Sequence, residues 1–400
     1  MRKAPNRKAF IVPGFRFASI PAGIKKSGTD DLALIFSEAP AAAAGVFTTN
    51  KIKAAPVRLA IKRINSHRGQ AIIINSGNAN ACTGKRGLKD AEETSEKTAN
   101  ELGISPELVY ASSTGVIGRP LPLDKIKKAL PELVGRLSPS SLQQVASAIM
   151  TTDTFAKIST RKLRIGKKTA TITGIAKGAG MIRPNMATML CFIFTDMSIK
   201  HQALDSALKD AVKNSFNKIT VDNDMSTNDT VMIMANGALQ NSPITRTSPF
   251  YGKFADALND ITHELSKMIV QDGEGATKLI EIIVKGARRE ADAEKAAKAV
   301  ANSMLVKTAI YGRDPNWGRI MAAIGYSGVE VIESNIDIYI NKTKLVGKGI
   351  GTDKEEIARN ILLNRNPTIT INLGAGTKSA TVLTCDLTKK YIEINAHYTT

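Results

Sequence analysis

Residues 177–194 read KGAGMIRPNMATMLCFIF. The last six of them, 189–194, are apolar throughout and include Phe192, Ile193 and Phe194, which are residue types that favour strands. Two glycines and Pro184 precede an Ala-Thr pair, and the apolar run begins directly after that pair. This pattern predicts a buried strand whose entry is marked by Thr188.

Similar apolar runs alternate with amphipathic helical patterns along the rest of the chain. Strands are predicted at 71–74, 169–175, 189–194, 231–234, 279–284, 329–340 and 368–373. Helices are predicted at 90–101, 123–137, 140–150, 202–215, 252–269, 290–302 and 354–362. Because the two types are interspersed, we expect an α/β (α+β) fold with helices packed on the faces of sheets.

The composition is that of an ordinary folded protein. The chain has 400 residues, of which 43% are hydrophobic, and this length suits two packed units or one large α/β body. Its three cysteines (Cys82, Cys191, Cys385) form no CxxC pair, which fits a reducing cytoplasm. Neither a secretion signal nor an apolar run long enough to span a bilayer is visible, so we expect a soluble protein that does not bind membranes.

The net charge of +19 is concentrated before position 188. Residues 1–187 contain 30 basic and 12 acidic side chains, whereas the remainder is nearly balanced. A basic surface attracts nucleic acid or anionic metabolites. However, the cations are scattered and aromatic residues make up only 5% of the chain, so we expect no nucleic-acid partner.

Three common site patterns fail on spacing or on residue type. The glycines of 77–84 are too far apart for a phosphate loop, and Arg86 stands where Ser or Thr should bind Mg²⁺. The segment 222–233 has Thr227 and Ile233 where a calcium loop needs Gly and Glu. The four histidines are far apart, so we expect no catalytic metal. We also expect no cofactor.

Thr188 has two interpretations. It is either an ordinary first strand residue or a nucleophile that attacks the carbonyl of Ala187, cleaves the chain and becomes a new amino terminus. The second would create an α-amine with an unperturbed pKa of about 7.7–8.0, which can accept a proton from its own hydroxyl. An acyl-transfer site also needs donors for an oxyanion, and the turn-like stretch 112–118 offers the Thr114 hydroxyl and the Gly115 N–H.

Eight segments in order carry a resemblance that covers nearly the whole chain. They are 45–50 (GVFTTN), 75–84 (NSGNANACTG), 113–118 (STGVIG), 177–190, 222–230 (DNDMSTNDT), 272–278 (DGEGATK), 312–319 (GRDPNWGR) and the final residues. With these segments, the sequence resembles the ornithine acetyltransferase (glutamate N-acetyltransferase) family of arginine biosynthesis, whose members process themselves and use an N-terminal Thr nucleophile.

The resemblance implies roles for particular residues. Thr188 would be the nucleophile, the bond between Ala187 and Thr188 the cleavage site, and Thr114 and Gly115 the oxyanion hole. Substrate contacts would fall at Thr151, Lys177, Thr188, Glu274, Asn395 and Thr400. Each of these also has a structural interpretation, as a helix end, a loop charge or part of a terminus. We expect a cation such as Lys177 to face a substrate carboxylate, and Glu274 to face the ornithine ammonium.

The resemblance also implies an activity and an assembly. The acetyl group of N2-acetylornithine would pass to Thr188 and then to glutamate, with acetyl-CoA left open as a second donor. Fragments 1–187 and 188–400 would stay together, two such pairs would form an α2β2 assembly in the cytoplasm, and the fold would be the sandwich shared with self-cleaving aminopeptidases. A self-processing aminopeptidase or amidohydrolase of that fold is the alternative function.

Overall fold

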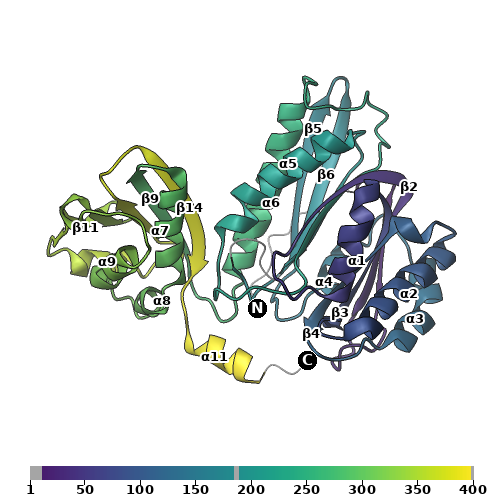
Figure 1. The fold of residues 1–400 in the computed structure, drawn as a ribbon, viewed down its shortest axis with the longest axis horizontal. Coiled ribbons are helices and arrows are strands. Elements are labelled where there is room, and N and C mark those ends of the chain that lie inside the picture. Colours follow the sequence, from purple (N-terminus) through teal and green to yellow (C-terminus); the bar gives the residue numbers. More distant parts are fainter. Residues whose placement is uncertain (1–10, 184–188, 398–400) are drawn as a thin grey trace.

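The computed structural model describes residues 11–183 and 189–397. The predicted cleavage site, with Ala187 and the nucleophile Thr188, and the predicted substrate contact Thr400 therefore lie outside the described residues. Within them the chain forms two sheets with helices packed against both, which confirms the predicted α/β class (Figure 1).

The larger sheet has eight strands in the order β4-β3-β2-β8-β7-β6-β5, with β1 paired to β2. Its strands are β1 Phe15–Ile20, β2 Leu32–Phe47, β3 Arg68–Asn78, β4 Val109–Val116, β5 Lys157–Ile165, β6 Lys168–Lys177, β7 Leu190–Thr195 and β8 Thr230–Ala235. The predicted strand at 189–194 is thus β7, and all six residues of β7 are buried. It pairs antiparallel with β6 and parallel with β8.

Helices cover both faces of the larger sheet. They are α1 Ala55–Arg63, α2 Gly84–Leu102, α3 Leu123–Gly135, α4 Leu142–Ala148, α5 His201–Asn214 and α6 Tyr251–Gln271. Side chains alternate along β7, as a strand buried on both sides requires. Cys191 and Ile193 join the core formed with α5 and α6, whereas Phe192 and Phe194 join the core that includes α4.

The second sheet has six strands in the order β12-β11-β10-β13-β9-β14. Its strands are β9 Leu279–Ala287, β10 Asp337–Ile340, β11 Thr343–Gly347, β12 Ile350–Gly351, β13 Thr368–Asn372 and β14 Lys378–Cys385, and its helices are α7 Glu290–Asn302, α8 Met304–Tyr311, α9 Trp317–Gly325 and α10 Glu355–Ile361. A separate core joins this sheet to α7, α8 and α9. The last described helix, α11 Lys389–Ala396, leaves this body and runs below the larger one (Figure 1).

The two bodies do not divide the chain at position 188. β6 and β7 precede and follow that position and are neighbours in one sheet, so a cut there would leave both fragments in the larger body. The expectation of a strand over 329–340 is wrong for its first part. Only Asp337–Ile340 is a strand, because the chain turns at Gly328 with φ +71° and forms a short 3-10 helix at Glu333–Asn335.

Candidate active site

One cleft brings together every predicted site residue that the structure describes. Its empty volume is about 600 Å³, including the part open to solvent. The predicted residues among its lining are Thr114, Gly115, Thr151, Lys177, Glu274 and Asn395. The other lining residues are Ile117, Thr152, Gly180, Met181, Ser226, Thr227 and Asn228. The lining comes from both sides of position 188 and from α11, which are segments far apart in sequence.

Thr114 and Gly115 lie near the end of β4, beside the parallel strand β3. The expectation of a turn over 112–118 is wrong for 112–116, because the register with β3 continues through them; only 117–118 form a turn. The register shifts next to Gly77, and Gly115 adopts φ +135° there. A Cβ on Gly115 would lie 2.3 Å from the carbonyl carbon of Gly77, so this position requires glycine.

Asn228 supports this end of β4, and sequence reasoning did not single it out. Its side-chain amide donates to the carbonyls of Ala79 (2.7 Å) and Ser113 (2.8 Å). The Ser113 hydroxyl in turn donates to the Asn75 side chain at 2.6 Å. Asn228 thus holds the residue before Thr114 from across the predicted cleavage. Its segment, 222–230, was considered above only as a failed calcium loop and as one block of the resemblance.

Lys177 ends β6 and is buried, with 3% of its surface exposed. Its ammonium donates to the hydroxyls of Thr151 at 2.8 Å and Thr114 at 3.1 Å. Burial lowers the pKa of Lys177, and the carboxylate of Asp153 partly offsets that effect. The lysine therefore connects two other predicted residues and places a cation in the wall of the cleft.

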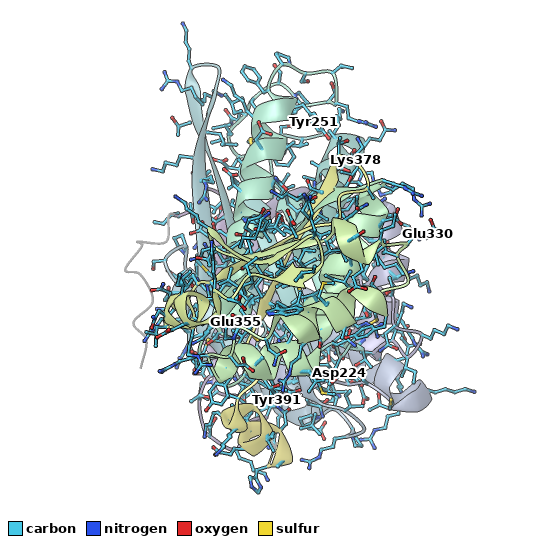
Figure 2. All side chains as sticks on the ribbon, turned by 90° about the vertical axis from the view of Figure 1, so that its left-hand side faces the viewer. Asp224, Tyr251, Glu330, Glu355, Lys378 and Tyr391 are labelled. Atoms are coloured by element: carbon cyan, nitrogen blue, oxygen red, sulfur yellow. The ribbon has the colours of Figure 1, made fainter. Side chains whose placement is uncertain are left out.

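Glu274 lies in the loop between α6 and β9, and α11 reaches it from the far end of the chain. Its carboxylate accepts a hydrogen bond from the side-chain amide of Asn395 at 2.7 Å. Gly180 leaves space for that carboxylate, because a Cβ at position 180 would lie 2.4 Å from it. Tyr391, at the lower end of the molecule in Figure 2, donates its hydroxyl to Asp222 at 3.3 Å. These bonds dock α11 against the cleft.

Asp229 lies directly before β8 and bonds to the first described residue after the predicted cleavage site. Its Oδ1 accepts the backbone N–H of Met189 at 3.0 Å, and Met189 is the residue that follows Thr188. The side chain is fully buried, and that burial raises the pKa of Asp229 well above its ordinary value. Sequence reasoning missed this residue. The available signal was an Asn-Asp pair immediately before an apolar strand.

The cleft therefore offers a buried cation, a carboxylate and several neutral donors. This set suits a small zwitterionic ligand, since Lys177 can face a carboxylate and Glu274 an ammonium. Between residues 11 and 183 and between 189 and 397, there is no group of three or more His, Cys, Asp or Glu side chains arranged to hold a metal ion. No helix in the same ranges is long and apolar enough to cross a membrane.

Comparison with known proteins places the chain in a family. The ArgJ family model matches residues 16–400. The arginine biosynthesis bifunctional protein ArgJ of Geobacter sulfurreducens is 51% identical over 97% of this chain and 100% of its own length, and that of Syntrophotalea carbinolica is 49% identical over 97% and 99%. A crystal structure of the arginine biosynthesis bifunctional protein argJ from Bacillus halodurans is 44% identical, covers 52% of this chain and 98% of its own, and superposes with a TM-score of 0.50. The chain belongs to the ArgJ family.

Proposed function

We propose that this protein is a glutamate N-acetyltransferase that moves the acetyl group from N2-acetylornithine to glutamate through an acetyl ester on Thr188. The observation that carries the proposal is the single cleft that gathers Thr114, Gly115, Lys177 and Glu274. The names of the ArgJ relatives, which refer to arginine biosynthesis, support the same pathway.

The chemistry follows from the groups in and beside the cleft. Self-cleavage between Ala187 and Thr188 frees the α-amine of Thr188, which takes the proton of its own hydroxyl as that oxygen attacks the acetyl carbonyl. The Thr114 hydroxyl and the Gly115 N–H stabilise the oxyanion. The Thr188 ammonium returns the proton to the amide nitrogen of the donor as the C–N bond breaks and ornithine leaves. In the second half-reaction the amine of glutamate attacks the acetyl ester, and the proton it gives up restores the Thr188 hydroxyl. The proposal predicts ping-pong kinetics, because one product departs before the second substrate reacts.

Charge complementarity selects the substrates. Lys177 binds the α-carboxylate, a group present in both donor and acceptor. The Thr151 hydroxyl holds the Lys177 ammonium in place by accepting its 2.8 Å hydrogen bond. Glu274 accepts the side-chain ammonium of ornithine. Asn395 orients Glu274, and Thr400 is proposed to add a further contact from the C-terminal tail. Through Asn395, α11 contributes to the lining of the cleft and helps to keep water from the ester.

The two fragments are proposed to remain associated after cleavage. β6 belongs to fragment 1–187 and β7 to fragment 188–400, and the six residue pairs between them, from Ile172↔Thr195 to Lys177↔Leu190, lie within one sheet. Breaking the chain at position 188 removes none of this pairing. We further propose that two such pairs form an α2β2 assembly in the cytoplasm, with no metal or other cofactor.

A second donor, acetyl-CoA, is part of the proposal. The curated relatives are named bifunctional, which supports an additional acetylation of glutamate from acetyl-CoA. The test is to supply purified protein with glutamate and either N-acetylornithine or acetyl-CoA, and to measure acetylglutamate. Product from both donors supports bifunctionality, and product from N-acetylornithine alone contradicts it.

Cleavage and transfer are tested together with one substitution. Denaturing mass spectrometry of the active wild-type protein should give two fragments divided at Ala187–Thr188. Thr188→Ala should give one uncleaved, inactive chain, whereas Thr188→Ser keeps a hydroxyl and should retain partial cleavage. An intact chain that transfers acetyl groups would refute the mechanism. Cleaved protein that only hydrolyses its substrates would instead indicate the self-processing aminopeptidase.

A further inference from the structure

Lys157 is an entirely buried cation outside the cleft. It begins β5, has none of its surface exposed, and pairs with two carboxylates. Its ammonium lies 2.6 Å from Oδ1 of Asp153 and 2.7 Å from Oδ2 of Asp272. Asp153 precedes position 188, whereas Asp272 follows that position and comes directly after the last residue of α6. A buried ion triad of this kind is a costly way to gain stability, which calls for another reason for its presence.

The two carboxylates also hold the backbone that forms the cleft. Asp153 accepts the N–H of Thr151 at 3.1 Å and the N–H of Gly178, the neighbour of Lys177, at 2.6 Å. On the other side, Asp272 lies two residues before Glu274 and accepts the N–H of Thr154 at 2.9 Å. Asp153 thus holds the backbone beside Thr151 and Lys177. Lys157 joins it to Asp272 near Glu274, alongside the direct hydrogen bonds from the N–H and hydroxyl of Thr154 to Asp272.

We propose that Lys157 is a positioning residue of the acetyl-transfer site, which holds Thr151 and Lys177 at the correct distance from Glu274 by linking Asp153 to Asp272. The inference rests on the proposed function and adds a residue that touches no substrate. It also gives the triad a role in joining the two fragments, since the ion pair between Lys157 and Asp272 crosses the predicted cleavage.

Electrostatics provides a signature that simple destabilisation would not produce. The pKa of Lys177 is lowered by burial and by the like charge of Lys157, and it is raised by the carboxylates of Asp153, Glu274 and Asp229. Lys25 is a further cation close enough to interact with Lys177. Removing the charge of Lys157 should therefore raise the pKa of Lys177. If charged Lys177 binds the substrate carboxylate, the alkaline limb of kcat/KM then moves to higher pH.

Two variants and one control separate these effects. Asp272→Asn keeps the shape of the side chain but weakens its bond to Lys157. The resulting small displacement of Thr151 and Lys177 relative to Glu274 should lower kcat/KM roughly 10- to 100-fold. Its alkaline limb should stay in place, whereas that of Lys157→Met should move to higher pH. The control is Asp196→Asn, since Asp196 is also buried and accepts a backbone N–H, from Thr171 towards the opposite end of β6. It should leave kcat/KM unchanged.

The outcomes are distinguishable. If Asp272→Asn folds and keeps the wild-type kcat/KM, or if Asp196→Asn loses as much activity, the inference is wrong. A wild-type protein that transfers no acetyl group refutes the proposed function instead, and amide hydrogen exchange then tests the link directly. Asp272 bonds directly to Thr154, and it reaches Thr151 and Gly178 through Lys157 and Asp153. The amides of Thr151 and Gly178 should exchange faster in Asp272→Asn, and unchanged exchange overturns the inference.

Discussion

Replacing Gly115 with alanine is the sharpest test of the proposed oxyanion hole. The added Cβ would lie 2.3 Å from the Gly77 carbonyl carbon and 2.5 Å from the Asn78 nitrogen. Both are backbone atoms, so a rotamer change cannot relieve the contact. Overpacking of this kind costs about 1–3 kcal/mol, and an unfavourable φ costs about 1–3 kcal/mol more. We therefore expect Gly115→Ala to lose about 2–6 kcal/mol of unfolding free energy.

The backbone displacement that relieves this contact would also move the Gly115 N–H away from the oxyanion. Loss of one such donor typically lowers kcat by about 10²–10³-fold. Acetyl transfer would be measured in the folded fraction, with urea denaturation to quantify stability and mass spectrometry to quantify cleavage. The matched control is Gly118→Ala, where φ is +83° but no atom lies within 4 Å of the added Cβ. It should lose stability alone. Wild-type stability and kcat in Gly115→Ala would refute the assignment.

Three further substitutions test other parts of the cleft. In Gly180→Ala the new Cβ would lie 2.4 Å from the Glu274 carboxylate and should push that carboxylate aside. The KM for N-acetylornithine should then rise roughly tenfold. An unchanged KM would argue against a substrate role for Glu274. Asn395→Ala should raise the same KM less, because the Glu274 carboxylate loses one 2.7 Å hydrogen bond but is not pushed aside; a KM equal to that of the wild type would contradict this. Burial raises the pKa of Asp229, so the folded wild type loses stability as pH rises from the ordinary Asp pKa through the raised one. Asp229→Asn cannot ionise and should lack this loss, which urea denaturation at several pH values would detect.

Local patterns were sufficient for much of the secondary structure. The apolar run after Thr188 predicted β7. Successive residues of a strand face opposite sides, so a strand that is buried on both sides is apolar at every position. The helical patterns at 252–269 and 290–302 correspond to α6 and α7. Segment 112–116 was misjudged as turn-like because its small polar residues carry little strand signal, and pairing with β3 decides its conformation.

For the site, the sequence determined which residues to examine, and only the tertiary structure decided which of them meet. The family resemblance implied roles for Thr114, Gly115, Thr151, Lys177, Glu274 and Asn395, and the fold places all six around one cleft. No pattern in the chain could have paired Lys157 with Asp272. Those two residues meet because α6 packs against β5 and β6, and the burial that makes their charges interact strongly exists only in the folded protein.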